Sequence, residues 1–511
     1  MKKSRFKWLA FRNIDGFLIS LTGFFLILIY TSHSGIGISP DSIIYLSVAR
    51  NIDLHGTLLD YNLRPLVDFP VFYPVFLSVV GFLSRVDLVA VAPYLNGLLF
   101  ALNIIITGYL IDSFAHSDKI YKRILLVLIA LSPSLLDIYS MLWSETLFIF
   151  LTLVFITAIS KYLSNYHLSF LLMAACIAAV SFITRYAGIT VMAAGLMLIC
   201  FDRKLPLRKK TGHLALFGMM AVSLLILNLW HNTIRSGSLT GPREAGITSL
   251  GDNILLYGKV ICDWFPLLIQ HPQTIIFVVV IIFITVSCVF LYRSISGRGY
   301  TTAENCFMAF FIVYTVFIIG VSTLSHFEGI NNRLLCPLYI PMLICLSSWI
   351  PQSVSLLEGL KSKISLALLS VALIAFMINQ LTVMQQMYHE ASNYGIAGYT
   401  DDSWKTSPLS KFLRQHPGIF DPEYDLYSNA HEAAYFNGGL NAESIPHRKD
   451  LSDVHDFFND TGQYLIWFNN FSDTDLISLA TIRKHASVVK QYSFKDGAIY
   501  FVLPYPVLPH P

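Results

Sequence analysis

The sequence predicts a mainly helical polytopic membrane protein that carries a small α/β domain at its C-terminus. The first observation is that only 13% of the 511 residues are charged, against roughly 25% in soluble chains, while 55% are hydrophobic. The second is that apolar runs fill the chain up to about residue 387, after which turn residues become frequent. This composition excludes a cytosolic enzyme, and the lack of dense basic patches excludes a nucleic-acid binder.

Long apolar runs predict about 11 transmembrane helices, because a helix needs about 20 mainly apolar residues to cross a bilayer. The runs are residues 14–31, 88–112, 124–136, 143–160, 168–183, 187–201, 213–230, 273–292, 305–324, 337–350 and 364–384. The basic first residues resemble the start of a signal peptide. No small-residue cleavage pattern follows the first apolar run, so we expect that span to be retained.

The distribution of Lys and Arg predicts the orientation of these spans. With a cytoplasmic N-terminus, the inner connections carry most of the Lys and Arg that precede residue 388, above all in the segment 203–210. Positive charge collects on the cytoplasmic side of membrane proteins. We therefore expect a multi-pass protein of the inner or plasma membrane, with its C-terminal domain outside the cytoplasm.

Two sizeable regions are then expected on the outer face. Residues 1–387 form a transmembrane module whose first outer loop is 32–87, and residues 388–511 form the extracytoplasmic α/β domain. The C-terminal region is predicted to contain alternating short strands and helices. An Asp-Gly turn between two β-rich runs is typical of a hairpin. The expected segments are strands 425–428 and 464–468, helices 431–436 and 473–484, and a hairpin of 488–494 with 498–503.

The first outer loop begins with a helix signal that contains an acid. In the segment 39–42, Ser39 suits the cap, Pro40 the first helical position and Asp41 the first turn. Ile44 and later apolar residues recur every four positions, which predicts an amphipathic helix along the membrane surface. Asp41 would lie at the lipid–water boundary, either as a functional carboxylate or simply as an acid that caps the helix.

An aromatic and proline-rich run follows in the same loop. It extends from Asp68 through Tyr73 to an apolar stretch that ends at Arg85. The stretch is too short to span a bilayer securely, so we expect a second interfacial helix. The alternative is an ordinary segment of the aromatic belt at the membrane interface.

Three charged residues lie at the outer ends of predicted spans. Glu145 begins an otherwise apolar span, Arg185 separates two spans, and Arg333 enters the tenth. Charges so close to a bilayer are costly and mark candidate functional sites. Each also has a plain alternative, a solvated carboxylate at a helix N-terminus or an arginine that reaches the interface. Together with Asp41 they suggest a site for an anionic lipid head group, since the guanidinium fork fits phosphate oxygens.

Other chemical signals are weak in this sequence. The histidines are scattered without metal-ligand spacing, and no phosphate-binding loop, dinucleotide motif or nucleophile elbow is present. We therefore expect no metal and no cofactor. With no inner soluble domain to bind a nucleotide, an activated substrate must arrive already in the membrane.

The arrangement resembles the GT-C superfamily of integral-membrane glycosyltransferases. The residues that carry the resemblance are Pro40-Asp41-Ser42 with Tyr45 after the first span, then Tyr73-Pro74 before an apolar helix. The segments around 144–145, 184–188, 333 and 427–436 are similar too. The likeness is to users of dolichyl- or undecaprenyl-phosphate sugars: protein O-mannosyltransferases, the lipid A aminoarabinose transferase and galacturonosyltransferases of the lipopolysaccharide core.

The resemblance implies an inverting transfer from a polyprenyl-phosphate sugar to a lipid, glycan or protein acceptor on the outer face, in the cell envelope. Asp41 matches the family's catalytic base, although Ser42 stands where many members have a second acid. The expected substrate-binding residues are Tyr45, Asp68, Tyr73, Glu145, Arg185, Tyr186 and Arg333.

Three other functions compete with this one. A transporter or flippase for a lipid-linked sugar would show internal repeats and charged, broken helices near the midplane, which the sequence lacks. An O-antigen polymerase or ligase would depend on arginines of a later outer loop, for which Arg235 and Arg243 qualify. A non-catalytic scaffold whose outer domain binds a partner would be indifferent to Asp41.

Overall fold

The computed structural model describes residues 14–114, 118–241, 243–265, 271–326, 328–355, 359–459 and 462–505. By their internal contacts these residues form two compact units. The helical unit comprises Met1–Ser32 and Pro65–Glu390, and the α/β unit comprises His33–Arg64 and Ala391–Pro511. The α/β unit thus combines half of the predicted first outer loop with the C-terminal region.

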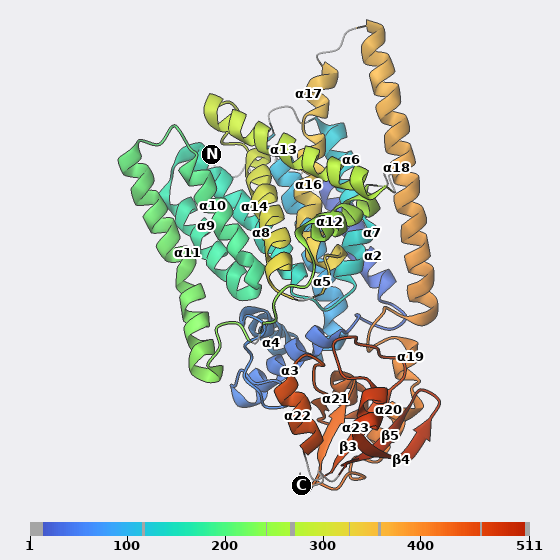
Figure 1. The fold of residues 1–511 in the computed structure, drawn as a ribbon. Helices are drawn as coiled ribbons and strands as arrows, with labels where there is room; N and C mark the ends of the chain where they lie inside the picture. The colour runs from blue at the N-terminus through green and yellow to red at the C-terminus, as the bar shows by residue number, and fades with distance from the viewer. Residues whose placement is uncertain are drawn as a thin grey trace. The chain divides into compact units, whose positions relative to one another are not determined.

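The helical unit is a bundle of mostly long, apolar helices (Figure 1). Its elements are α2 (Ile14–Tyr30), α4 (Phe72–Ser84), α5 (Leu88–Ile111), α6 (Lys119–Ala130), α7 (Pro133–Tyr139), α8 (Glu145–Asn165), α9 (Leu168–Thr184), η1 (Tyr186–Gly188), α10 (Ile189–Cys200), α11 (Leu207–Ser236), α12 (Leu250–Trp264), α13 (Pro272–Ser296), α14 (Ala303–Leu324), α15 (Asn332–Leu335), η2 (Cys336–Leu338), α16 (Tyr339–Ser347), α17 (Ile350–Ser355) and α18 (Gly359–Tyr394).

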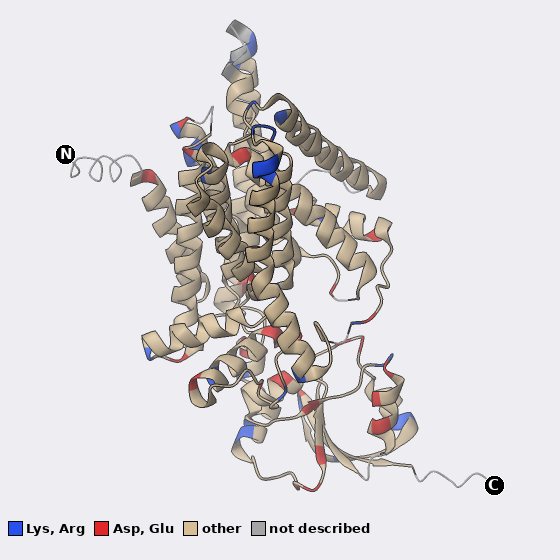
Figure 2. Ribbon diagram, turned by 90° about the vertical axis from the view of Figure 1, so that its left-hand side faces the viewer, with Lys and Arg blue, Asp and Glu red and all other residues tan. Residues whose placement is uncertain are grey.

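Within the described residues, seven helical segments are long and apolar enough to cross a membrane. They are Leu88–Ile111, Glu145–Asn165, Leu207–Ser236, Pro272–Ser296, Ala303–Leu324, Asn332–Val354 and Lys363–Tyr394. Four shorter apolar segments accompany them: Ile14–Tyr30, Phe72–Ser84, Leu168–Thr184 and Tyr186–Cys200. Figure 2 shows the middle of these helices almost without charged residues. The chain is therefore a multi-pass membrane protein, and the expected count of about 11 spans stays a prediction.

One of the predicted spans is not a continuous helix in the structure. The sequence predicted one run over 124–136, but α6 ends at Ala130 and α7 begins at Pro133. Proline cannot donate the backbone hydrogen bond that a continuing helix needs. Ser132 instead caps the new helix, because its side chain accepts a hydrogen bond from the Leu135 amide at 3.3 Å.

Close packing of α2 against α5 depends on two glycines. A Cβ atom on Gly23 would lie 2.6 Å from Ile104 Cδ1, and one on Gly97 would lie 2.9 Å from Phe24 Cδ2. Small residues at helix contacts let two backbones approach closely inside a membrane protein. The bundle continues through α8, whose apolar window is 72% buried and which contacts α5 and α9.

The α/β unit contains a five-stranded mixed sheet. The strands are β1 (Asp425–Ser428), β2 (Glu443–Ser444), β3 (Gln463–Phe468), β4 (Ala486–Phe494) and β5 (Gly497–Pro504), in the order β2-β1-β3-β5-β4. β1 pairs in parallel with β2 and β3, whereas β5 is antiparallel to β3 and β4. The helices are α3 (Pro40–His55), α19 (Asp402–Lys405), α20 (Pro408–Gln415), α21 (His431–Gly438), α22 (Leu451–Asn459) and α23 (Leu479–His485).

Most predicted elements of the C-terminal region are confirmed within a residue or two. The exception is the helix predicted over 473–484, because α23 begins only at Leu479. Asp473 accepts a hydrogen bond from the Asp475 amide at 2.8 Å, and the Ile477 amide donates to the Pro446 carbonyl at 3.0 Å. These bonds hold the segment as a turn and a bridge, so the helix starts at its Ser478 cap.

Candidate functional site

Three of the predicted charged residues meet inside the helical unit. Arg185 Nη1 lies 2.6 Å from Glu145 Oε2, and Arg333 Nε lies 2.7 Å from Glu145 Oε1. The Glu145 side chain is 1% exposed, while those of Arg185 and Arg333 are 17% and 14% exposed. One buried carboxylate is thus held between two largely buried guanidinium groups, which we call the arginine cluster.

Local backbone structure places each member of the arginine cluster. Arg185 follows α9 in an extended conformation, and a tight 3-10 turn comes after it. Gly188 in that turn packs so closely that a Cβ atom would lie 2.3 Å from the Ser181 carbonyl. Arg333 belongs to the short helix α15, whose cap Asn331 accepts a hydrogen bond from the Leu334 amide at 3.1 Å. The pairing thus joins segments far apart in the sequence.

Both arginines of the arginine cluster contact the same buried carboxylate. Two guanidinium groups face one buried carboxylate, and Ser144 Oγ accepts a hydrogen bond from Arg185 Nη1 at 2.9 Å. Glu328 lies 3.6 Å from Arg333 Nη1, but its side chain is 43% exposed and solvent screens its charge. Arg333 also stacks 4.4 Å from the Trp143 ring centroid. Such a cluster suits an anion with several oxygen acceptors.

A second group in the helical unit forms around Tyr186. Its hydroxyl donates to the Val67 carbonyl at 2.7 Å, so the residue next to Asp68 is anchored there. Asn232 Nδ2 donates to the same hydroxyl at 3.2 Å, and the Arg243 guanidinium lies 5.9 Å from the Tyr186 ring centroid. Asp68 is exposed. This group brings two predicted residues, Asp68 and Tyr186, into one neighbourhood.

Tyr73 is the remaining predicted residue of the helical unit. It lies in the first turn of α4 and is fully buried. Its ring stacks on Phe76 with a centroid distance of 6.4 Å. Asp41 and Tyr45, by contrast, belong to the α/β unit.

Asp41 lies in the first turn of α3, as predicted. Ser39 and Ser42 form a reciprocal capping box, and Pro40 occupies the start of the helix. The exposed amides of a helix N-terminus favour negative charge. Tyr45 lies one turn further on and is buried. The local sequence therefore places the Asp41 carboxyl at the N-terminus of α3.

The segment before α3 is fastened to the C-terminal region. The Tyr399 amide donates to the Ile38 carbonyl at 2.7 Å, and Thr400 Oγ1 donates to the Ile36 carbonyl at 2.8 Å. Lys405 Nζ donates to the Ser34 carbonyl at 2.9 Å. These bonds fix the start of α3, so the α/β unit determines where Asp41 lies.

Sequence reasoning missed two further acids of the α/β unit, Glu432 and Asp473. Glu432 is the second residue of α21, the helix that follows β1, and Asp473 lies in the loop after β3. The pKa of Glu432 is raised to about 7. Burial of its side chain is the main cause, and the nearby charges of Asp41 and Asp473 add to it. We call Asp41, Glu432 and Asp473 the acid cluster.

A sequence signal for these acids did exist. β1 and β3 are parallel neighbours, and ligands of α/β sheets gather beyond the carboxyl ends of parallel strands. Asn429 joins the two strand ends, because its side chain donates to the Phe468 carbonyl at 2.9 Å and accepts from the Phe468 amide at 2.8 Å. Polar residues directly after two predicted strands were therefore candidates.

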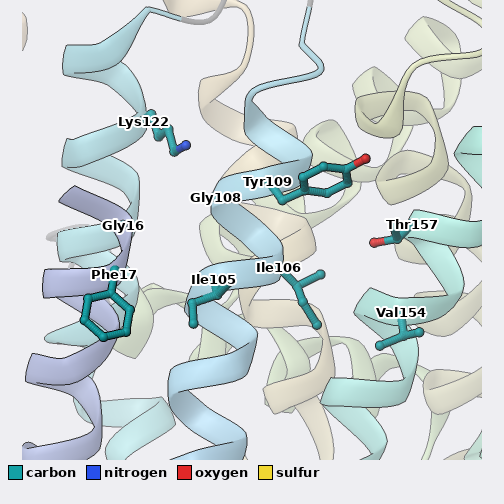
Figure 3. A pocket seen from close by; sticks show the side chains of 9 residues that line it. All are labelled: Gly16, Phe17, Ile105, Ile106, Gly108, Tyr109, Lys122, Val154 and Thr157. Atoms are coloured by element: carbon teal, nitrogen blue, oxygen red, sulfur yellow. The ribbon is translucent and has the colours of Figure 1, made fainter. Parts of the chain in front are cut away.

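A cavity of about 450 Å³ lies apart from the arginine cluster. α2, α5, α6 and α8 line it, with Phe17, Ile105 and Ile106 among its apolar walls (Figure 3). Lys122 is the charged residue of this lining, and its Nζ lies 2.6 Å from Asp112 Oδ2. The lining offers an apolar surface instead of reactive groups. Within the described ranges, no group of three or more His, Cys, Asp or Glu could hold a metal ion.

No family model and no curated protein sequence matches the chain. Solved structures do match. ArnT from Cupriavidus metallidurans in the apo state has a TM-score of 0.57 at 12% identity, over 98% of each chain. The same protein bound to undecaprenyl phosphate has a TM-score of 0.56 at 12% identity, over 96% of this chain and 98% of that one. The arabinofuranosyltransferase AftD from Mycobacteria has a TM-score of 0.49 at 13% identity, over 98% of this chain and 40% of that one.

The chain has the fold of ArnT. The likeness to ArnT extends over nearly the full length of both chains, so it includes the helical bundle and the C-terminal sheet. At 12% identity the likeness concerns the fold, because one fold can carry different chemistries.

Proposed function

We propose that this chain is a membrane glycosyltransferase that moves a sugar from a polyprenyl phosphate to an acceptor. The observation that carries the proposal is the arginine cluster, Arg185 and Arg333 around Glu145, in a chain with the fold of ArnT. ArnT was solved with undecaprenyl phosphate bound. Two neighbouring guanidinium groups are suited to a lipid phosphate, whether in the donor or in the leaving group.

The proposed reaction is a displacement with inversion at the anomeric carbon. An acceptor hydroxyl or amine forms a bond to that carbon while the bond to the phosphate oxygen breaks. The electron pair leaves with the polyprenyl phosphate, whose charge the arginine cluster stabilises. The acceptor proton passes to the Asp41 carboxylate. Proton transfer to Asp41 occurs late, when bond formation has made the attacking atom acidic.

The remaining predicted residues have supporting roles in this proposal. Tyr45 supports the acceptor side near Asp41, and Tyr73, Tyr186 and Asp68 bind the donor sugar or lipid. The distribution of Lys and Arg supports an inner or plasma membrane protein whose N-terminus is cytoplasmic and whose transfer reaction occurs on the outer face. The acceptor is a lipid, glycan or protein of the cell envelope.

The test combines donor binding and sugar transfer. Purified protein in lipid nanodiscs is supplied with undecaprenyl phosphate alone for binding, and with a panel of undecaprenyl-phosphate sugars and envelope extract for transfer. We expect Arg333→Lys to weaken binding about tenfold, because lysine keeps the charge but loses the planar fork. Arg123→Lys is the matched control, since Arg123 forms a surface ion pair with Asp15. Equal binding by Arg333→Lys and the wild type would contradict the proposed lipid site.

An O-antigen polymerase or ligase is the second candidate function. The observation in its favour is the position of Arg243 over the Tyr186 ring, 5.9 Å from the centroid. In that case Arg243→Ala abolishes activity while Asp41→Asn does not. Arg123→Ala serves as the control, because Arg123 forms an exposed ion pair with Asp15.

A further inference from the structure

Two carboxyl groups from distant parts of the chain belong to one neighbourhood in the α/β unit. Helix α3 carries Asp41, helix α21 carries Glu432, and the two helices pack against each other. The stacked rings of Tyr61 and Tyr435, 4.4 Å between centroids, reinforce this contact. Asn441 Nδ2 also donates to the Tyr61 carbonyl at 2.9 Å. α21 is therefore held firmly against the chain that includes Asp41.

Burial and neighbouring acids both disfavour the charged form of Glu432. Its side chain is 13% exposed, and His431 Nδ1 lies 3.3 Å from Glu432 Oε2. Burial first, and the charge of Arg64 second, lower the pKa of His431 to about 4, so the imidazole is neutral at pH 7. The negative charges near Glu432 come from Asp41 and Asp473. This environment favours the protonated carboxyl until about neutral pH.

A buried phenol marks the same place. Tyr399 is 3% exposed, and its hydroxyl has no hydrogen-bond partner among the described residues. Glu432, Tyr61 and Asp473 act electrostatically on it, and its pKa is raised by burial first and by these groups next. A buried polar atom without a partner calls for a ligand or a change of state that satisfies it. An acceptor hydroxyl or amine next to the acid cluster would do so.

We propose that Glu432 is a second acid of the Asp41 site, and that its ionisation sets how readily Asp41 takes the proton of the acceptor. This inference rests on the proposed function, in which Asp41 is the base. Glu432 is a positioning residue in this scheme, because it acts through Asp41. It fills the role of a paired acid that the neighbouring Ser42 cannot supply.

The proton balance follows from the like charges of the pair. When the acceptor attacks the anomeric carbon, its proton moves to Asp41 and the electron pair of the broken bond leaves with the phosphate. An ionised Glu432 adds negative charge beside Asp41 and favours the protonated aspartate that this step forms. A protonated Glu432 gives no such help. Product release then returns the proton from the acid pair to water.

The pH dependence has a definite sign. Glu432 loses its proton as the pH rises through about 7, so the transfer rate rises through the same window. Glu432→Gln imitates the protonated form, so it removes this step and lowers the rate at pH 8. We expect about a tenfold loss, since coupling of about one pK unit between two carboxyls is a factor of ten. The titratable groups around Glu432 are Asp41, Tyr61, Tyr399, His431 and Asp473, and the charge of Arg64 acts on Tyr61 and His431.

The first arm of the test measures transfer rate against pH from 5 to 9. Wild type and Glu443→Gln are expected to share a rise near pH 7, because Glu443 is an exposed partner of Arg64 outside the acid cluster. Glu432→Gln should lack the rise, and Glu432→Asp, which keeps a carboxyl, should retain it. A rise near pH 7 that persists unchanged in Glu432→Gln would overturn the inference.

The second arm needs no substrate and separates this inference from the proposed function. Thermal unfolding from pH 4 to 9 is compared for wild type, Asp41→Asn, Glu432→Gln and the double variant. The wild type should lose stability as the pH rises towards 7, and Asp41→Asn should shift this loss to lower pH. Glu432→Gln and the double variant should lack the loss, because neither has a carboxyl at position 432. An unshifted loss in Asp41→Asn overturns the coupling even if no donor supports transfer, whereas a shifted loss without transfer by any donor contradicts only the proposed function.

Discussion

Two buried glutamates of this chain have opposite surroundings. Glu145 in the helical unit lies within 2.7 Å of two guanidinium groups, Arg185 and Arg333. Glu432 in the α/β unit has Asp41 and Asp473 as its charged neighbours. Burial alone favours the neutral form of a carboxyl, and the sign of the nearby charges decides whether that preference is reversed or reinforced. Glu145 is therefore a fixed anion, and Glu432 is a carboxyl that exchanges its proton near neutral pH.

The two units are accordingly suited to different chemistry. The arginine cluster offers two guanidinium groups and suits the phosphate of a lipid-linked sugar. The acid cluster offers carboxyl groups and suits the removal of a proton from an acceptor. Glycosyl transfer from a polyprenyl phosphate needs both functions, because charge develops on the leaving phosphate while the nucleophile loses a proton.

Asp41→Asn should have the strongest effect on transfer. We expect the rate to fall by about 10²–10⁴-fold, the usual contribution of a general base. Asp53→Asn in the same helix is the matched control, because Asp53 is exposed and outside the acid cluster. Sugar transferred per minute in nanodiscs measures the effect. Near-normal transfer by Asp41→Asn would leave the acid cluster without its proposed role.

Glu145→Gln tests the arginine cluster through stability. It leaves two buried guanidinium groups without their carboxylate, so the free energy of unfolding should fall by about 3–5 kcal/mol. Thermal unfolding in nanodiscs measures the change, with Glu390→Gln near the end of α18 as an exposed control. An unchanged or increased stability would show that the arginines do not depend on Glu145.

Glu432→Gln should change stability in the opposite direction to Glu145→Gln. The pKa of Glu432 is raised from 4.5 to about 7, so between these values the folded protein keeps a proton that the unfolded chain has lost. Stability therefore falls as the pH rises through this window, by about 3 kcal/mol in total at about 1.4 kcal/mol per pK unit. Glu432→Gln should be more stable than wild type at pH 8 and nearly equal to it at pH 4. A destabilised Glu432→Gln at pH 8 would contradict the proposed difference between the charged surroundings of Glu145 and Glu432.

A weaker effect is expected at Tyr399. Its buried hydroxyl lacks a hydrogen-bond partner among the described residues, so Tyr399→Phe should raise the free energy of unfolding by about 1 kcal/mol. Tyr394→Phe, at an exposed tyrosine, should change nothing measurable in the same thermal unfolding assay. A destabilising Tyr399→Phe would show that the hydroxyl has a hydrogen-bond partner within the protein, which would contradict a role in binding a ligand.

The sequence predicted what depends on local chemistry. Ser39, Pro40 and Ser42 determine the start of α3 through neighbouring residues alone, and apolar runs likewise located most helices of the bundle. The break between α6 and α7 also has a local cause, Pro133, but the apolar composition of the segment does not indicate it. Hydrophobicity alone predicts one continuous span here, whereas the absence of a backbone N–H at Pro133 favours a break.

The acid cluster depends on contacts that no local pattern contains. The Tyr399 amide meets the Ile38 carbonyl from a distant part of the sequence, and this pairing brings the start of α3 into the α/β unit. No local pattern distinguishes Glu432 from a surface acid at a helix start, because its burial arises only when α21 packs on α3. Its position after a parallel strand was the available signal, yet the strand partners could not be read from the sequence.

The decisive measurement is transfer by Asp41→Asn from an undecaprenyl-phosphate sugar, made beside its binding of undecaprenyl phosphate. We predict that the variant binds the lipid as tightly as wild type and transfers sugar at least about a hundredfold more slowly. Transfer at the wild-type rate by a correctly folded Asp41→Asn protein would contradict the assignment of Asp41 as the base.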